Sequence, residues 1–171
     1  MENFYSRFKG RILLLSPAYL FFLFLFSSQS AFAQPSNDDP CNAITIFPTN
    51  TCTYLSFDNI NATPSAGVPA PGCASYQGAD VWFRVTVPCT GSLVFDMQQG
   101  TFADAGMAIY SGTTCTALTL IECDDDDGTG NMSYIARSGL TPASTIWIRV
   151  WEFGGDETGT FGICVTTPPP P

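Results

Sequence analysis

The chain contains no histidine, and its one lysine, Lys9, lies near the N-terminus. Histidine and lysine are the bases that most often activate a serine, threonine or cysteine nucleophile. No Cys-x-x-Cys pair occurs either, so the ligand spacing of a structural zinc site is also missing. These absences predict a protein that is not an enzyme. A hydrolase with a catalytic pair of carboxylates is the alternative, although no particular pair of acids stands out.

Basic side chains are scarce throughout. After residue 33 the basic side chains are Arg84, Arg137 and Arg149, against fourteen acidic ones, so that part carries a net charge of −11. Such a surface repels the phosphates of nucleic acids and the headgroups of anionic lipids. The composition disfavours nucleic acid and direct membrane binding, and leaves divalent cations and neutral or cationic partners open.

The first 33 residues have the pattern of a secretory signal peptide. Three basic residues precede the apolar run Ile12–Phe26, and Ala31-Phe32-Ala33 supplies a small-x-small cleavage pattern. An uncleaved anchor helix is the alternative, but this run would span only about 22 Å of a ~30 Å hydrocarbon core. We predict cleavage before Gln34 and a secreted or cell-surface protein.

No stretch of the remaining chain repeats apolar residues with the period of a helix, so almost no helix is expected. Short runs of β-branched and aromatic residues alternate with polar ones and end at Gly, Pro, Asn or Asp. The predicted strands are Ala43–Phe47, Cys52–Phe57, Asp80–Val87, Ser92–Asp96, Met107–Ser111, Ala117–Glu122, Met132–Arg137, Thr145–Phe153 and Thr160–Val165. About nine strands predict an all-β fold, an antiparallel β-sandwich of jelly-roll type. We assign this domain to residues 34–166, followed by a polyproline linker over residues 167–171.

All seven cysteines follow the predicted signal peptide. In an exported chain they indicate a framework of disulfides. Cys115 and Cys123 are close enough in sequence to close a hairpin, so we predict that they pair. Because the count is odd, one thiol is left over, and Cys89 in its turn is the candidate. The partners of the other four cysteines stay open.

Two predicted strands carry tryptophan and arginine on one face. In Asp80–Val87 the odd-numbered residues are all apolar, and in Thr145–Phe153 the residues Ile146, Ile148 and Val150 form the apolar set. If the strands are neighbours, the side facing away from the core gathers the candidate ligand-binding residues Trp82, Arg84, Trp147, Arg149 and Trp151. Such a patch can be a cluster stabilised by cation–π contacts, or a platform for sugar rings or an extended peptide.

Two acidic stretches are candidate metal sites. The strand Ala117–Glu122 is followed by the run of four aspartates Asp124, Asp125, Asp126 and Asp127. Neighbouring carboxylates repel one another unless a cation lies among them, and Ca²⁺ takes about six to eight oxygen ligands. Asp38 and Asp39, at the start of the domain, form the second candidate. A calcium cofactor is the hypothesis for both, and a solvated hairpin tip and a flexible leader remnant are the alternatives.

Six motifs follow one another in a characteristic order. They are NDDPCNAI from Asn37, DVWFRVTVP from Asp80, AIYSGTTC from Ala108, GLTP from Gly139, IWIRVWEF from Ile146 and GTFGICV from Gly159. Together they resemble the bacterial pre-peptidase C-terminal (PPC) domain, in the cysteine-containing form common in secreted modular proteins of Bacteroidetes. The resemblance covers residues 37–165.

The resemblance implies a non-catalytic, jelly-roll-like module appended to secreted peptidases, adhesins and cell-surface proteins. In related collagen-binding modules, calcium sits where the N-terminal linker meets the sandwich and outer-sheet aromatics contact the ligand. Asp38 and Asp39 match that linker, and Trp147 and Trp151 match that aromatic strand. A CUB-type sandwich is the alternative fold. We predict a calcium-stabilised binding module for extracellular polysaccharide, protein fibre or cell-surface adhesion, monomeric within a longer chain. A ligand-free spacer is the alternative.

Overall fold

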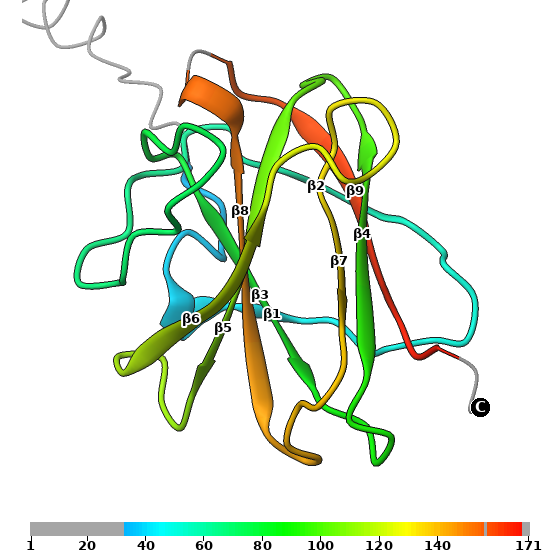
Figure 1. Cartoon of the computed structure of the whole chain (residues 1–171). Helices are drawn as coiled ribbons and strands as arrows, with labels where there is room; N and C mark the ends of the chain where they lie inside the picture. The colour runs from blue at the N-terminus through cyan, green and yellow to red at the C-terminus, as the bar shows by residue number, and fades with distance from the viewer. Residues whose placement is uncertain (1–32, 156, 169–171) are drawn as a thin grey trace, which may run out of the picture. The chain divides into compact units, whose positions relative to one another are not determined.

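The computed structural model describes residues 33–155 and 157–168. Nine strands and two short 3-10 helices, η2 (Pro40–Asn42) and η3 (Phe153–Gly155), make up its regular structure (Figure 1). Each of the nine predicted strands is found, so the predicted all-β sandwich is confirmed. The predicted signal peptide, apart from Ala33, and the last three residues of the predicted linker lie outside the described residues. Both assignments therefore stay predictions.

The strands form two sheets that pack face to face. In the five-stranded sheet the order is β1 (Ile44–Thr45), β3 (Val81–Thr86), β8 (Thr145–Glu152), β5 (Ala105–Gly112) and β6 (Leu118–Asp124). In the four-stranded sheet it is β2 (Leu55–Asp58), β9 (Thr160–Thr166), β4 (Leu93–Gln99) and β7 (Tyr134–Arg137). Strand β1 runs parallel to β3, whereas every other neighbouring pair is antiparallel.

The main core lies between the two sheets and is built by alternation. Odd-numbered residues of β3 and even-numbered residues of β8 point into it, as predicted, and Val81, Phe83 and Ile148 are fully buried there. The ring of Phe83 lies 4.6 Å from that of Phe57 and 6.1 Å from that of Phe161, between centroids. Full burial of one such side chain contributes about 1.5–3 kcal/mol, so burial of this layer strongly favours folding.

A second apolar cluster lies on the outer face of the five-stranded sheet. It contains Trp82, Tyr110, Trp147 and Trp151, and the chain over residues 62–79, which we call the covering segment, packs against it (Figure 1). Gly106 on β5 makes room for this packing, because a Cβ atom there would lie 2.3 Å from the Trp151 ring. Around Trp82 and Trp151 the sheet is therefore buried on both faces.

Three disulfides hold the sandwich together. They are Cys41–Cys115, Cys52–Cys164 and Cys73–Cys123, and Cys89 is free and exposed, as predicted. The predicted Cys115–Cys123 bridge is wrong. Cys115 precedes β6 and Cys123 lies near its far end, and a strand rises about 3.3 Å per residue, which separates the two thiols. Each bonds instead to a distant segment, and Cys73–Cys123 ties the covering segment to the sheet.

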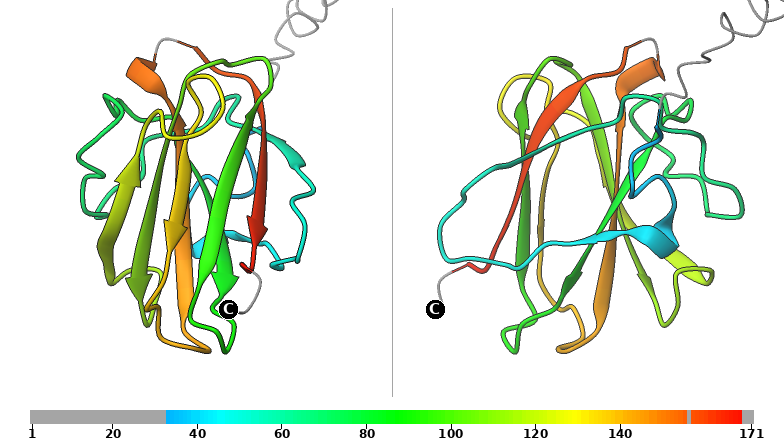
Figure 2. Two further views of the ribbon diagram at one scale, coloured as in Figure 1. Left: turned by 45° about the vertical axis from the view of Figure 1, so that its right-hand side comes forward. Right: turned by 180° about the vertical axis from the view of Figure 1, so that it is seen from behind.

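The two sides of the sandwich, where the sheet edges meet, differ. At the β6/β7 side, Arg137 on β7 forms an ion pair of 3.3 Å with Glu122 on β6, which joins the two sheets. At the β1/β2 side, the chain between the two edge strands arcs away from the sheets before it returns as β2 (Figure 2). Among the described residues, no helix is long and apolar enough to cross a bilayer.

Candidate functional site

The tryptophan and arginine residues predicted to form a surface platform are brought together, since β3 and β8 are neighbours. Trp82 lies opposite Arg149 and Arg84 lies opposite Trp147 in the register of the two strands. The expectation that this face is exposed is wrong, however. Trp82, Arg149 and Trp151 are at most 1% exposed, because the covering segment lies over them. Only Arg84 is exposed, and its Nε donates to the Thr45 hydroxyl.

Arg149 is buried with a carboxylate partner. Its Nε donates to Asp80 Oδ2 at 3.0 Å, and its guanidinium lies over the ring of Tyr76, 4.1 Å from the centroid. Asp80 also accepts hydrogen bonds from the Ser65 hydroxyl, the Tyr76 hydroxyl and the Trp82 indole nitrogen. Ser65 and Tyr76 belong to the covering segment, so this network fastens the segment onto the sheet.

The same burial shifts the pKa values of the network. Burial alone would lower the pKa of Arg149, but the hydrogen bond and charge of Asp80 outweigh it, and the net pKa is raised. Burial raises the pKa of the Tyr76 hydroxyl, and its hydrogen bond to Asp80 raises it further. Arg149 therefore stays charged and Tyr76 stays neutral, which is the arrangement of a structural anchor.

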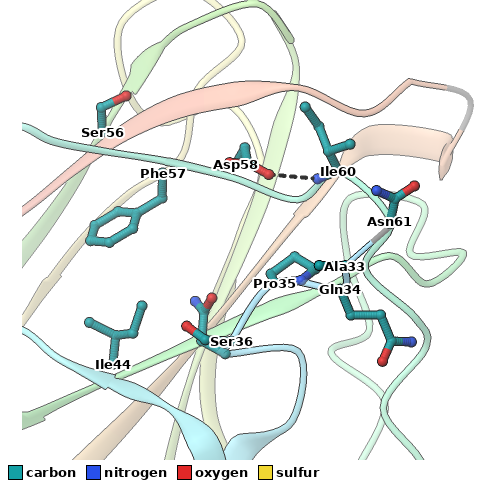
Figure 3. Close-up of a pocket in the computed structure, with 11 residues that line it drawn as sticks. Ala33, Gln34, Pro35, Ser36, Ile44, Ser56, Phe57, Asp58, Ile60 and Asn61 are labelled. Carbon is teal, nitrogen blue, oxygen red and sulfur yellow. Dashed lines mark hydrogen bonds between the residues drawn. The ribbon is translucent and has the colours of Figure 1, made fainter. Parts of the chain in front are cut away.

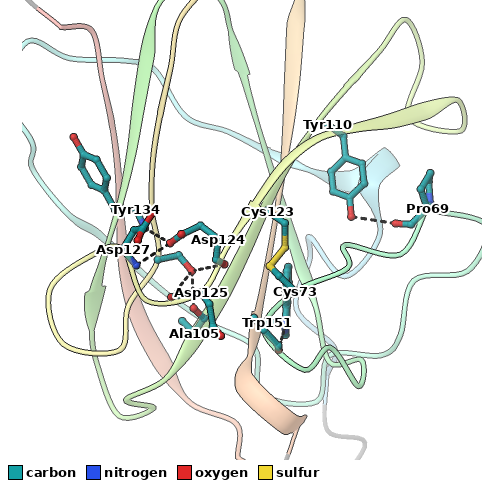
Figure 4. Close-up of a disulfide and its surroundings, with 12 residues drawn as sticks. Pro69, Cys73, Ala105, Tyr110, Cys123, Asp124, Asp125, Asp127, Tyr134 and Trp151 are labelled. Carbon is teal, nitrogen blue, oxygen red and sulfur yellow. Dashed lines mark hydrogen bonds between the residues drawn. A yellow bond between two sulfur atoms is a disulfide. The ribbon is translucent and has the colours of Figure 1, made fainter.

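A ligand could reach Trp82, Arg149 or Trp151 only if the covering segment moved away, and Trp147 is buried as well. That segment is held by the Cys73–Cys123 disulfide and by hydrogen bonds such as that from the Trp151 indole to the Ala74 carbonyl, at 2.9 Å (Figure 4). The ligand-binding role of these side chains stays a prediction, without an open surface to support it.

Asp38 and Asp39, the first of the predicted metal pairs, separate in the structure. Asp38 is buried and its carboxylate accepts hydrogen bonds from the backbone N–H and the hydroxyl of Thr63, both at 2.6 Å. Asp39 is exposed and precedes η2. Asp38 therefore binds the start of the covering segment, and this contact satisfies the carboxylate without a metal.

The four-aspartate run lies where β6 ends and turns toward β7. Asp124 Oδ2 accepts the backbone N–H groups of Tyr134, at 2.8 Å, and of Asp127, at 3.3 Å (Figure 4). The Ser133 hydroxyl lies within hydrogen-bonding distance of the carbonyls of Asp124 and Asp125. Burial raises the pKa of the Asp124 carboxyl although these backbone hydrogen bonds lower it. Asp124 thus shapes the β6–β7 loop.

Asp125 and Asp126 lie close to Asp104, which is not among the metal ligands predicted from the sequence. One oxygen from each of the three carboxylates lies within 4.8 Å of the others. Oδ1 of Asp104 and Oδ1 of Asp125 are shielded from solvent and have no hydrogen-bond partner. Burial raises the pKa of Asp125, and the charges of Asp126, Asp104 and Asp124 raise it further. A cation among these oxygens would compensate both costs.

The signal that could have found Asp104 is the hairpin formed by β5 and β6. Met107 lies opposite Asp124 in this antiparallel pair. Residues just before β5 must therefore approach residues just after β6, which places Asp104 near Asp125 and Asp126. In the part of the chain that the structure describes, Asp96 also lies near two possible metal ligands, Cys52 and Cys164, but these two cysteines are bonded to each other.

Exposed apolar side chains gather at the β1/β2 side. Of five large hydrophobic residues in the described chain that are markedly exposed, four lie along this stretch, and the list is Phe47, Tyr54, Leu55 and Ile60, with Phe153 elsewhere. Phe47, at 78%, is the most exposed. Two hollows flank β2. One of about 420 Å³ lies beside Ile44, Phe57 and Ile60 (Figure 3), and one of about 320 Å³ lies beside Phe47 and Leu55. We call this surface the open side.

A family of known domains matches most of this chain. The family model described as galactose binding domain-like, and associated with type IX secretion (T9SS), matches residues 36–153. The chain belongs to this family. No curated protein matches the chain.

Two solved structures are similar to this galactose binding domain-like chain at low identity. The pre-peptidase C-terminal domain of collagenase from Bacillus anthracis is 9% identical, with a TM-score of 0.48, and the match covers 78% of this chain and 99% of that one. CorA, a surface-associated copper-binding protein of Methylomicrobium album BG8, is 8% identical, with a TM-score of 0.45, and the match covers 74% and 99%. A PPC domain is thus among the matches, as the sequence motifs indicated. The bacterial phylum stays a prediction.

The family model describes a galactose binding-like domain, a type of accessory module that fits the prediction of a non-catalytic protein. The secretion-associated family and the three disulfides both indicate a secreted or surface protein. Within residues 33–155 and 157–168, two features of this galactose binding domain-like chain are candidate sites for an ion or a partner molecule. They are the carboxylates of Asp104, Asp125 and Asp126, and the open side.

Proposed function

We propose that this protein is an extracellular, non-catalytic accessory module that binds a neutral or cationic polymer, a polysaccharide or a protein fibre, within a larger secreted or surface protein. Calcium stabilises the module. The family assignment, the disulfides and the acidic surface support this proposal. The same role fits adhesion at a cell surface.

The observation that carries the binding function is the open side. Single exposed apolar side chains are ordinary on protein surfaces, whereas a group of them beside a hollow is typical of an interaction surface. Phe47 and Leu55 flank one hollow, and Ile60 lies at the other. An aromatic ring that is mostly in water can stack on the apolar face of a sugar ring or on a proline ring. The burial gained on binding is the driving force.

The charge of the module restricts the class of polymer that it can bind. Arg149 is buried with Asp80 and Arg137 is paired with Glu122, so Arg84 is the exposed arginine without a carboxylate partner in the described chain. With a net charge of −11 after residue 33, the module repels polyanions. Neutral polysaccharides and neutral or basic fibrous proteins remain, and acidic polysaccharides are disfavoured.

Binding of the exported full chain to glycan arrays and to insoluble protein fibres tests the proposal. We expect one neutral polymer to retain the wild-type protein, and a Phe47→Ala, Leu55→Ala double variant to lose at least about tenfold in affinity. Phe153→Ala is the matched control, since Phe153 is also exposed but lines neither hollow. Equal binding by the double variant and the control would remove the open side from the function. The unfolding midpoint should be the same in all three proteins.

The carboxylates of Asp104 and Asp125 support the proposal that calcium binds to the module. The orphaned, shielded oxygens of Asp104 and Asp125 are hard ligands of the type that calcium prefers. We expect calcium to raise the melting temperature of the protein and EDTA to reverse the increase. An unchanged melting temperature at millimolar calcium would contradict this part of the proposal.

A ligand-free spacer is the second candidate function. The observation that favours it is the burial of Trp82, Arg149 and Trp151 beneath the covering segment. The face that was predicted to bind a ligand is therefore part of the protein interior. A spacer would retain no polymer in the binding experiment but would keep the same thermal stability, so the two candidates are separated by that one measurement.

A further inference from the structure

We infer that the open side binds an extended peptide with basic side chains, which pairs with the free edge of β2 and becomes a further strand of the four-stranded sheet. Extended peptides bind many domains in this way, by main-chain hydrogen bonds along a sheet edge. The inference rests on the proposed function and deepens it, because it selects a protein segment among the neutral and cationic polymers and names the groups that hold it.

The edge of β2 that faces away from β9 is unpaired. Strand β2 lies at one end of its sheet and pairs with β9 alone. In an antiparallel pair, the N–H and C=O groups of every second residue face the partner strand, and those of the residues between face away. The Asn59 N–H donates to the Gly159 carbonyl at 3.2 Å, so the odd-numbered residues face β9. Ser56 and Asp58, both exposed, therefore direct these groups outward, and in the described part of the chain no other segment is hydrogen-bonded to them.

The sandwich also has room for another strand beside β2. Leu55 and Phe57 lie on the same face of this strand, because side chains alternate, and Phe57 packs against the core whereas Leu55 is 46% exposed. The edge strand of the other sheet, β1, has only two residues. Hollows of about 420 Å³ and about 320 Å³ lie beside Phe57 and Leu55, and β1 lines them through Ile44 and Thr45 (Figure 3). An added strand would direct every second side chain into this space.

Strand β2 lacks the features with which proteins often protect an edge strand. Such strands commonly carry a proline, a lysine or a bulge. The sequence of β2 is Leu-Ser-Phe-Asp, and its register with β9 runs without interruption from Leu55 to Asp58. The other edge of the same sheet, β7, is tied to the opposite sheet by the ion pair of Arg137 with Glu122. The contrast between the two edges indicates that β2 is the one that can accept a strand.

Charge favours a basic peptide over a second copy of the chain. Asp58 lies on the outer face of the four-stranded sheet, and so does Asp96, whose neighbours Phe95 and Met97 point into the core. Strands β2, β9 and β4 contain no lysine or arginine. A basic residue on the added strand would therefore meet opposite charge, and such pairs on neighbouring strands are stabilising. Two copies of this chain, each with a net charge of −11 after residue 33, repel one another.

Fluorescence anisotropy tests the inference, with labelled nine-residue peptides in which lysine alternates with valine, leucine or phenylalanine. We expect the exported full chain to bind at least one of them, and to bind its glutamate counterpart at least about tenfold more weakly. Ser56→Pro removes an outward N–H but no bond to β9, and should weaken binding by at least about tenfold. Ala136→Pro is the matched control, because Ala136 is exposed and is the equivalent outward position on the other edge strand, β7. It should bind the peptide as the wild type does.

A second measurement does not depend on the folding of a variant. When the peptide binds the wild type, hydrogen exchange followed by NMR should slow at the amides of Ser56 and Asp58. It should stay unchanged at the amide of Phe57, which already faces β9. This alternation is specific to the addition of a strand. A complex in which the three amides respond alike, or in which Ser56→Pro binds as tightly as Ala136→Pro, would overturn the inference.

The outcomes also separate this inference from the proposed function. If a polysaccharide or a fibre retains the wild type through Phe47 and Leu55 but none of the peptides binds, the added strand is overturned and the proposed function stands. If no polymer and no peptide binds, both fail. Equal binding of the lysine and glutamate peptides would overturn the choice of a basic partner.

Discussion

The outer face of the five-stranded sheet and the open side both carry large apolar side chains, but only the first is covered. On the sheet face, Trp82 and Trp151 are fully buried under the covering segment. Hydrogen bonds and the Cys73–Cys123 disulfide hold this segment in place. On the open side, Phe47 and Leu55 lie in water beside a hollow. The difference shows that strand alternation assigns a side chain to a face, whereas the chain between strands decides whether that face is exposed.

The largest effect is expected where the covering segment is anchored by the buried ion pair. Asp80→Ala leaves the Arg149 charge buried and unpaired, so we expect a loss of about 3–5 kcal/mol in the free energy of unfolding. Denaturant unfolding followed by tryptophan emission measures it. In the double variant Asp80→Ala, Arg149→Met, most of that loss should be recovered, because no unpaired charge remains. A loss below about 1 kcal/mol in the single variant would show that the pair does not hold the cover.

The disulfide that ties down the covering segment should have the next largest effect. Replacing both Cys73 and Cys123 by serine removes a link between residues 50 positions apart in sequence, and we expect a loss of about 2–4 kcal/mol. The loss should be concentrated in the cover, so chymotrypsin should cleave after Tyr76 faster than in the wild type, and hydrogen exchange should rise in residues 62–79.

A matched control is the replacement of Cys52 and Cys164 by serine, which removes the disulfide between the chain just before β2 and strand β9 of the other sheet. That variant should lose stability too, without faster cleavage after Tyr76. Equal cleavage rates in the two double variants would mean that the covering segment opens only when the whole protein unfolds. The Cys73–Cys123 disulfide would then not hold this segment separately from the rest of the fold.

Much of the fold follows from the sequence because its rules are local. The nine strands and the inward faces of β3 and β8 came from a period of two, and Cys89 was correctly assigned as free. The cover over Trp82 could not be predicted, because residues 62–79 have no periodic pattern and are placed by contacts with Asp80 and Arg149 that are distant in sequence. The Cys115–Cys123 pairing failed for the same reason. Closeness along the chain was taken for closeness in space, although an extended strand separates its ends.

The candidate metal site could be predicted from the sequence only in part. Its acidic run is visible in the sequence, but the ligand set depends on the β5–β6 register, which brings in Asp104 and diverts Asp124 to the backbone of Tyr134. A hairpin drawn explicitly from the predicted strands would have paired their ends. The apolar hollows at the open side have no comparable signal in the sequence. The chain between β1 and β2 lines the hollow beside Leu55, and residues 33–37 line the hollow beside Ile60.

The smallest expected effect concerns a polar contact at the margin of the open side. Tyr54, next to Leu55, donates its hydroxyl to Asp96 Oδ2 at 2.9 Å. Burial, then the hydrogen bond to Asp96 and the Asp96 charge, raise the pKa of Tyr54 to about 12. Since the folded pKa lies above the ordinary value of 10.0, the stabilisation from this contact is complete below pH ~10 and is lost as the pH rises through ~12.

Absorbance titration at alkaline pH should detect this contact, with Tyr54→Phe identifying the transition that belongs to Tyr54. In Asp96→Asn the neighbouring charge is gone but burial remains, so the pKa of Tyr54 should fall below about 12 without reaching its ordinary value. A full return to that value would contradict the contribution of burial, because it would show that the contact with Asp96 alone raises the pKa of Tyr54.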